Sequence, residues 1–394
     1  NLGSSHVGAR RPMKPVLWAP HAGLPPCLLH LLLLLDAPLR LAGDAAAGDS
    51  DVAVCLAGRL RALSRTLDLA RSNFLAALQP GAAAGPDVFL YAPAPTSAEV
   101  AGLARLFEPP AAVRAARFDD EGYVLEALGR RHAAVLKKAM RIRGNWLGST
   151  NREILPGSHD RRAGTGIFMM HAHEQCLEMI REREDRRGSP YGRVVFTRTD
   201  LRWIFPHPPL DLLSPAFAWI PDTGEDDWGG LYDKHLVLAR AAADHALGGW
   251  RLLTSGRAYE LVLGLVGEQA LRGNDTNTEL WLALRLLAAG VRVARFPMTA
   301  YVSCDPGQWV AEVDARVPMH ELRKFQCSEE RDGRYPLEFA AVARLAECLS
   351  LARSQAKLVA QWSRAAALRC YCGGQMPAVL EGDAFPDRWE LCSR

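Results

Sequence analysis

Charged side chains follow directly after a short apolar run in the middle of the chain, Val194-Val195-Phe196. Such a run of β-branched and aromatic residues is typical of a strand that is buried on both faces. The run ends at Arg198 and Asp200. In open α/β sheets, ligands bind beyond the carboxyl ends of the strands, where an arginine can hold a phosphate and an aspartate can hold a metal ion or a hydroxyl. The pattern predicts the floor of a binding site, although a strand that only turns at a charged loop has the same pattern.

A second polar stretch, residues 222–235, reads D-T-G-E-D-D-W-G-G-L-Y-D-K-H. Its paired glycines would let the backbone approach a ligand, and Trp228 and Tyr232 could stack on a sugar or base ring. The stretch therefore predicts a ligand-binding loop. The alternative is an acidic loop that only caps the helix expected to follow it.

A third polar stretch, residues 273–279, reads G-N-D-T-N-T-E. Thr276 or Asn277 can cap the helix expected after it, and Glu279 in the first turn would complement the helix dipole. Alternatively, Glu279 faces the site as an acceptor-binding carboxylate or as a base. Asn274 also begins an N-glycosylation sequon.

Gly58 lies where the first expected strand turns into a helix, and Arg59 follows it. A residue without a Cβ lets a phosphate approach the backbone, and the helix N-terminus favours anions. The stretch has neither G-x-G-x-x-G nor G-x-x-x-x-G-K-[ST], so a dinucleotide-binding or P-loop site has no support. A plain turn is the alternative.

Alternating apolar runs and helical patterns predict the elements that position these residues. Strands are expected at 51–56, 87–91, 113–118, 194–197, 218–221 and 291–296, and helices at 60–78, 97–107, 167–187, 278–289 and from Leu236 onward. The β-α-β-α-β order at the start implies parallel strands with right-handed crossovers. The predicted fold class is α/β, with a mostly parallel central sheet flanked by helices and a helical C-terminal extension.

The beginning of the chain has the pattern of a secretory signal peptide or a short signal anchor. A basic residue, Lys14, precedes an apolar core at 27–35 and small residues at 45–47. A disordered leader of biased composition is the alternative. We therefore expect a leader at 1–50, the domain that carries the three polar stretches at 51–305, and a cysteine-containing extension at 306–394. The formal net charge of +3 is too small to indicate a nucleic-acid partner.

Cysteines cluster in the last quarter of the chain. Of nine in total, six lie there: Cys304, Cys327, Cys348, Cys370, Cys372 and Cys392. Such clustering favours a disulfide-tied tail in an oxidising compartment. With the leader, it predicts a protein of the Golgi or endoplasmic reticulum lumen, or a secreted one. Any membrane association would come through an uncleaved N-terminal segment.

Four motifs carry a family resemblance: C-L-A-G-R-L-R, Y-G-R-V-V-F-T-R-T-D-L-R-W, D-D-W-G-G-L-Y-D-K-H-L-V-L-A-R and N-T-E-L-W-L-A-L-R-L-L-A-A-G-V-R-V-A-R-F. Their order and spacing over about residues 51–305 resemble uncharacterised glycosyltransferase-like proteins of algae and other protists. They are also similar, more distantly, to the WavE-type lipopolysaccharide synthesis family. The resemblance implies a GT-A-like nucleotide-diphospho-sugar transferase fold.

In that fold, an acidic motif after a central strand binds a divalent metal that bridges the donor diphosphate, and Asp200 matches its position. The motif reads R-T-D rather than D-x-D. Either an acid from 222–227 completes a Mn²⁺ or Mg²⁺ site, or Arg198, Arg202 and Lys234 neutralise the diphosphate without a metal.

The resemblance thus implies a lumenal glycosyltransferase acting on a nucleotide-sugar donor and a glycan or glycoprotein acceptor. Gly58 and Arg59 would lie at the donor phosphates or base, and Asp200 would hold the metal or the ribose. Asp233 or Glu279 would be the general base or a ligand of the acceptor hydroxyl. The implied acceptor-binding residues are Trp228, Tyr232 and Asn277. The alternatives are a glycan-binding protein without turnover and a structural secreted protein.

Overall fold

The computed structural model describes residues 50–60, 63–79, 85–93, 112–119, 121–144, 146–147, 166–223, 227, 229–273 and 276–303. All of them belong to one unit of the chain, Asp44–Arg394. Several predicted features lie outside these residues: the leader, the helix at 97–107, Trp228, the sequon at Asn274, and the C-terminal extension with its cysteines. No helix within the described ranges is long and apolar enough to span a membrane.

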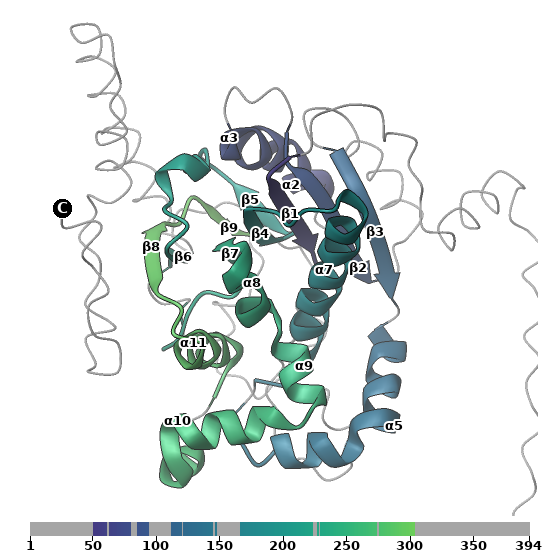
Figure 1. Ribbon diagram of the computed structural model, residues 1–394, viewed down its shortest axis with the longest axis vertical. Helices are drawn as coiled ribbons and strands as arrows, with labels where there is room; N and C mark the ends of the chain where they lie inside the picture. The colour runs from purple at the N-terminus through teal and green to yellow at the C-terminus, as the bar shows by residue number, and fades with distance from the viewer. Residues whose placement is uncertain are drawn as a thin grey trace, which may run out of the picture. The chain divides into compact units, whose positions relative to one another are not determined.

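The central sheet has seven strands in the order β3-β2-β1-β4-β7-β6-β8 (Figure 1). Their bounds are β1 Val52–Ala57, β2 Asp87–Pro93, β3 Ala112–Asp119, β4 Arg193–Arg198, β6 Ala218–Asp222, β7 His235–Ala239 and β8 Val293–Pro297. Within this sheet β7 is antiparallel to both of its neighbours, and the remaining pairs are parallel. The α/β fold with a mostly parallel sheet is therefore confirmed. A separate two-stranded ribbon joins β5 (Leu201–Trp203) to β9 (Ala300–Val302).

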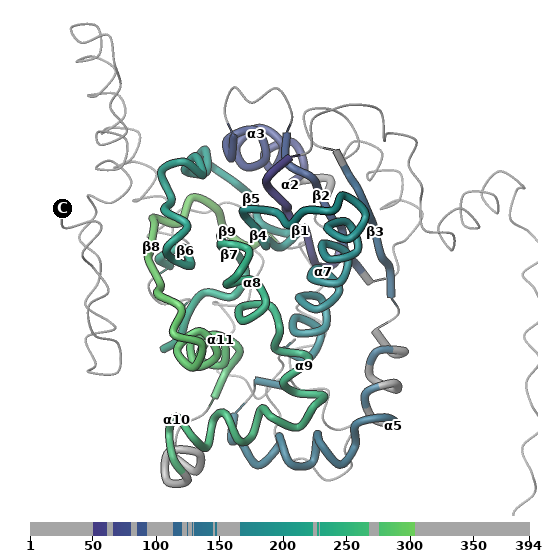
Figure 2. The backbone as a smooth tube through the Cα atoms, in the orientation of Figure 1, coloured from purple at the N-terminus to yellow at the C-terminus, as the bar shows by residue number. Residues whose placement is uncertain are grey.

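Helices cover both faces of the sheet, and Figure 2 traces how the chain passes between them. Their bounds are α2 Leu63–Leu69, the π-helix η2 Ala70–Leu75, α3 Ala76–Leu78, α5 Glu121–Ala139, α7 Gly166–Arg187, the 3₁₀ helix η4 Leu210–Leu212, α8 Arg240–Leu247, α9 Gly249–Thr254, α10 Arg257–Gly273 and α11 Thr278–Ala288. Side chains alternate between the two faces along a strand. Phe196 contacts His173, so α7 covers the face to which Phe196 points. His235 is the register partner of Thr197, the next residue along β4, and it contacts Phe74 of η2, so η2 covers the opposite face.

The helix predicted from Leu236 onward is wrong at its start. Residues His235–Ala239 form strand β7, and α8 begins at Arg240. The four-residue apolar run at 236–239 is compatible with either a buried strand or a helix when its periodicity is considered alone. Here the first four residues of β7 are all buried, because β7 lies between β4 and β6 with helices on both sides.

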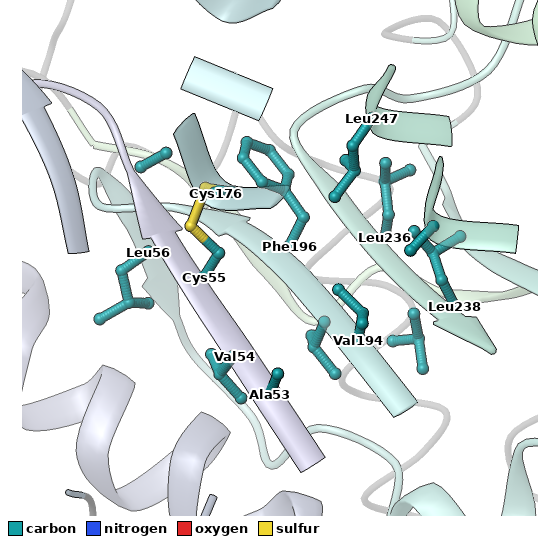
Figure 3. Close-up of a cluster of buried hydrophobic side chains, with 14 of the residues drawn as sticks. Ala53, Val54, Cys55, Leu56, Cys176, Val194, Phe196, Leu236, Leu238 and Leu247 are labelled. Atoms are coloured by element: carbon teal, nitrogen blue, oxygen red, sulfur yellow. A yellow bond between two sulfur atoms is a disulfide. The ribbon is translucent and has the colours of Figure 1, made fainter. Parts of the chain in front are cut away.

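A disulfide between Cys55 of β1 and Cys176 of α7 joins the sheet to the helix that covers it (Figure 3). Both cysteines are fully buried. Around them lie apolar residues of the neighbouring strands, including Phe196 of β4 and Leu236 of β7. The bridge therefore sits in the centre of the main hydrophobic core, and it connects residues 121 positions apart.

On the other face, aromatic rings enclose two buried histidines. Phe74 of the π-helix stacks on Trp203, with ring centroids 4.7 Å apart. His207 Nδ1 lies 2.6 Å from the Pro208 carbonyl oxygen, to which it donates, and the Nε2 atoms of His207 and His235 lie 3.1 Å apart. His207 Nε2 therefore accepts a hydrogen bond from His235 Nε2–H, and both rings are neutral. Burial lowers the pKa of His207 to about 3 and that of His235 well below its ordinary value.

We expect removal of the disulfide to destabilise the fold. A Cys55→Ala/Cys176→Ala double variant should lose about 2–4 kcal/mol of unfolding free energy, since the bridge restricts a long loop of the unfolded chain. Urea unfolding with and without dithiothreitol measures this. The reductant should lower the stability of the parent protein by more than that of the double variant, which lacks this bridge; an equal effect on both would contradict the bridge.

The buried histidines predict acid destabilisation. The folded-state pKa of His207 lies below its unfolded value of about 6.5, so as the pH falls from 6.5 towards 3 only the unfolded state takes up its proton. The free energy of unfolding should therefore fall by about 1.4 kcal/mol per pH unit for this residue. In urea titrations, the stability difference between the parent and His207→Asn should shrink by that amount per unit below pH 6.5. Parallel pH profiles would count against the buried neutral ring.

Candidate active site

The sheet has a topological switch point between β1 and β4. From β1 the chain continues through α2 to β2 on one side, whereas β4 lies on the other side of β1 and is reached through α7. These two helices cover opposite faces, and in open α/β sheets this is the place, beyond the carboxyl ends of the two strands, where ligands bind. Ala57 and Arg198 are register partners at that end. The residues that follow both strands are therefore brought together.

Hydrogen bonds join the two loops at the switch point. Thr199 N donates to the Ala57 carbonyl at 3.0 Å, and Thr199 Oγ1 donates to the Arg59 carbonyl at 2.9 Å. Gly58 has a φ of 129°, which favours glycine, and a Cβ there would lie 3.0 Å from Thr199 Oγ1. The need for glycine thus comes from this turn and its packing. Arg59 itself is exposed to solvent.

Arg198 and Asp200 form a two-pronged ion pair. Arg198 Nε donates to Asp200 Oδ1 at 2.8 Å, and its Nη2 pairs with Oδ2. Burial alone would lower the pKa of the Arg198 guanidinium, but Asp200 raises it, and the net pKa lies above its ordinary value. Arg198 therefore stays charged, and both carboxylate oxygens of Asp200 are used to balance it.

The described residues do not fit the predicted divalent-metal site. The oxygens of Asp200 contact Arg198, and Asp227 pairs instead with Arg295 of β8 at 2.7 Å and accepts from Thr223 at 3.0 Å. Within the described ranges, no group of three or more histidine, cysteine or acidic side chains could hold a metal ion. Asp227 was expected to be able to complete the metal shell, and this expectation is wrong because it balances a buried arginine.

The antiparallel strand β7 brings the second polar stretch to the same edge. Arg198 N donates to the Lys234 carbonyl at 3.1 Å, so the residues just before β7 lie beside the end of β4. β6 is parallel to β4, since both pair antiparallel with β7, so the stretch that follows β6 also begins at this edge. Both ends of the second polar stretch therefore lie at the edge where β4 ends.

Two buried carboxylates share one lysine at this edge. Lys234 Nζ lies 3.6 Å from Asp233 Oδ1 and 3.4 Å from Glu279 Oε1. Asp233 is 5% exposed and Glu279 is 8% exposed. Burial, and then the charge of Asp233, raise the pKa of Glu279 to about 7, although Lys234 opposes them. Glu279 can therefore accept and release a proton near neutral pH.

The start of α11 fixes the position of Glu279. Asn277 is the N-cap, and its side chain accepts from Leu280 N at 2.7 Å, as one of the two predicted caps. The Thr278 hydroxyl donates to Glu279 Oε2 at 3.0 Å. Leu231 N donates to the Glu279 carbonyl at 3.1 Å, so the loop before β7 docks directly on this turn.

Gly230 and Tyr232 do not have the settings expected of them. A Cβ on Gly230 would lie 2.2 Å from the Glu279 carbonyl carbon, so this glycine allows close approach to α11, whereas nothing lies within 4 Å of a Cβ added to Gly229. Tyr232 is 1% exposed and lies beneath Lys234 Nζ, which is 4.6 Å from the ring centroid. Its ring is therefore packed in the protein and is not an open stacking surface.

Other predicted donor residues have different settings. Arg202 is half-buried in β5, opposite Tyr301 of β9.

Two residues near Asp233 are absent from the sequence-based prediction: His173, which is 2% exposed, and Arg285, which is 3% exposed. The charge of Asp233 acts on both of them. Arg285 interrupts the apolar run L-W-L-A-L-R-L-L-A-A, and a charge inside such a run indicates a buried, paired residue.

No protein-family profile matches the chain, and no curated protein matches it. Among solved structures, the apo form of mouse xyloside xylosyltransferase 1 is similar over 62% of this chain and 85% of that chain, with 13% identity and a TM-score of 0.35. A similarity of this size carries no functional conclusion. The likeness to the algal and WavE-type families remains an interpretation of the sequence motifs.

We expect Gly230→Ala to destabilise the site, because the new methyl group would overlap the backbone of Glu279 and Leu280, which cannot move away as a flexible side chain could. The expected loss is about 1–3 kcal/mol of unfolding free energy. Gly264→Ala on α10 is a matched control, since nothing lies within 4 Å of its added Cβ. It should gain about 0.5–1 kcal/mol. Equal urea midpoints for the two variants would disprove the tight contact.

Proposed function

We propose that this protein is a glycosyltransferase that moves a sugar from a nucleotide-diphosphate donor to a glycan or protein acceptor in the secretory pathway. One observation carries the proposal: at the switch point between β1 and β4, a cationic pair, Arg198 and Lys234, lies beside two buried carboxylates, Asp233 and Glu279. Cations suit a diphosphate, and a carboxylate with a pKa near neutrality suits proton transfer from a hydroxyl.

The proposed reaction assigns a role to each group. The acceptor hydroxyl gives its proton to the carboxylate pair, and its oxygen attacks the anomeric carbon of the donor sugar. The bond from that carbon to the diphosphate oxygen breaks, and the bonding electrons leave with the diphosphate. Arg198 and Lys234 stabilise the negative charge that develops there. Gly58 and Arg59 would lie at the donor phosphates or base, and the proposal includes no metal-dependent step.

The proposed location has independent support in the disulfide. Cys55 and Cys176 are buried and bridged, and such bonds form and persist mainly in oxidising compartments. This agrees with the leader pattern and with a glycan or glycoprotein acceptor in the Golgi or endoplasmic reticulum lumen. The compartment itself would be tested by localising the tagged full chain in cells.

The test is hydrolysis and transfer across a panel of nucleotide-diphosphate sugars, with Mn²⁺ and with a chelator. Arg198→Met should lower kcat/KM at least 100-fold, about 2.7 kcal/mol of transition-state stabilisation, because the diphosphate loses a charged partner. Arg117→Met is a matched control. Arg117 is also ion-paired, to Glu178, but it lies on the edge strand β3 and should change kcat/KM less than about twofold.

Each result decides between the candidate functions. Turnover of one donor that disappears in Arg198→Met supports the transferase. Binding of donor or glycan without hydrolysis or transfer of any donor would favour a glycan-binding protein and refute the enzymatic proposal. Equal loss in the Arg117→Met control would show that the effect on turnover is not specific to the switch point.

A further inference from the structure

Positive charge is concentrated on one group of helices next to the candidate site. This basic layer consists of residues 130–143, in α5 and the turn after it, and residues 249–267, in α9 and α10, which contact one another (Figure 1). It contains eight arginine and lysine side chains and one acid, Glu260, so its formal net charge is +7, whereas the whole chain has +3. The eight cations are Arg130, Arg131, Lys137, Lys138, Arg141, Arg143, Arg251 and Arg257.

The cationic side of α5 is left to the solvent because its apolar side is used in the interior. Leu136, Ala139 and Ile142 are buried in a second hydrophobic cluster, which also contains residues of α9, α10 and α11. Arg131 and Lys137 are exposed. Neither of them has an ion-pair partner in the part of the chain that the structure describes. Their charges are therefore available to a ligand.

Other cations of the layer are held in place by their neighbours. The guanidinium carbon of Arg141 lies 4.8 Å from the ring centroid of Tyr259, and Lys138 Nζ lies 5.6 Å from it. Lys138 also pairs with Glu260, the one acid of the layer. Arg251 pairs with Glu174 of α7. The acids thus balance a minority of the cations, and the layer keeps an excess of positive charge.

Backbone hydrogen bonds join the basic layer to the turn that carries Glu279. Thr276 N donates to the Arg143 carbonyl at 2.8 Å, and Trp146 N donates to the Thr276 carbonyl at 3.1 Å. A Cβ on Gly144 would lie 2.1 Å from the Thr276 carbonyl oxygen, so the glycine is needed for this contact. Thr276 is three positions before Glu279, and three residues span at most about 11 Å. The end of the basic layer therefore lies close to the candidate site.

We propose that the basic layer binds an acidic glycan, and that this glycan is the acceptor. Sulfate or carboxylate groups repeated along a sugar chain would pair with the exposed cations, while a hydroxyl of the same chain reaches Asp233 and Glu279. Complementary charge of this kind selects a partner and speeds its association. The binding step is independent of the proposed function, whereas the acceptor role rests on it.

A membrane or a nucleic acid fits the layer less well. An amphipathic helix binds a membrane through an exposed apolar face, and that face of α5 is buried. The exposed large apolar residues in the described ranges are Leu265 and Val266, at 38% and 37%, which is a small area for insertion. Single-stranded nucleic acid stacks on open aromatic rings, whereas Tyr259 is 8% exposed and contacts two cations.

Fluorescence anisotropy with labelled oligosaccharides and the full chain, in the absence of any donor, tests the binding step. The probes are a heparin hexasaccharide with sulfates, a hexagalacturonate with carboxylates alone, and maltohexaose as a neutral chain of equal length. The parent protein should bind at least one acidic probe and not maltohexaose. Its affinity should fall at least about tenfold between about 50 and 200 mM salt, since the contacts are between charges.

The double variant Arg131→Gln/Lys137→Gln should bind the acidic probe at least about tenfold more weakly, because two unpaired charges are lost. A matched control is Arg186→Gln/Arg292→Gln, which removes two exposed cations from the opposite edge of the sheet, at the end of α7 and just before β8. The control should keep its affinity within about twofold. Urea unfolding shows that both variants are folded, as expected for exposed side chains.

If a donor is turned over, Arg131→Gln/Lys137→Gln should raise KM for the acidic acceptor and leave kcat unchanged, because these residues bind the acceptor away from the reacting atoms. Binding of the acidic probe without turnover of any donor would support the basic layer as a glycan site and count against the transferase alone. Turnover with neutral acceptors and no binding of either acidic probe would overturn the inference and leave the transferase intact.

Three further results would also overturn the inference. One is an equal loss of affinity in Arg186→Gln/Arg292→Gln. The others are binding of single-stranded DNA, or of vesicles of phosphatidylserine and phosphatidylcholine, that is as tight as binding of the acidic sugars and is lost in Arg131→Gln/Lys137→Gln. Those two results would assign the basic layer to nucleic acid or to a membrane surface.

Discussion

The antiparallel pairing of β7 with β4 is the constraint on which the site depends. In a parallel pairing, the residues just before β7 would lie at the opposite edge of the sheet, far from the end of β4. Because β7 runs the other way, Asp233 and Lys234 reach the same edge as Arg198 and Asp200, and Lys234 accepts a backbone hydrogen bond from Arg198. The close approach of Gly230 to α11 then brings Glu279 to the same place. Three segments that are distant in sequence meet through one strand direction and one glycine.

The sequence predicted those parts of the fold that depend on local pattern. The strands predicted at β1, β2, β3 and β4 and the helical periodicity of α7 and α11 agree with the structure to within two residues. These elements are long or strongly apolar, so their periodicity distinguishes strand from helix. The start of β7 was misread as a helix, since its four apolar residues, 236–239, are too few to show a period. The ribbon of β5 and β9 was not expected, since its three-residue strands are stabilised by pairing rather than by sequence pattern.

For the site, sequence could indicate which stretches carry charge but not which charges pair. Asp200 looked like a metal ligand, and it balances Arg198; Asp227 looked like a second ligand, and it balances Arg295. The first pair is local, since Arg198 lies two residues before Asp200, whereas Arg295 lies 68 positions from Asp227 and is brought to it by the pairing of β6 with β8, which no local pattern contains. Arg285 shows the same limit of sequence reasoning for a residue that the sequence did not assign to the site. Its charge was visible in the sequence, but the Ala246 carbonyl to which it donates lies 39 positions earlier in the chain, at the end of α8.

Buried charges need a rigid surround if they are to act on a ligand, because a loose surround would reorganise as the reaction proceeds. The strands that carry the site are held on both faces. On one face the Cys55–Cys176 bridge ties β1 to α7, and on the other the rings of Phe74 and Trp203 pack around His207 and His235. His235 is the first residue of β7 and follows Lys234 directly, so this ring cluster fixes the strand end that carries the shared lysine. The packing of the core thus fixes the spacing of the charged groups before a ligand binds to them.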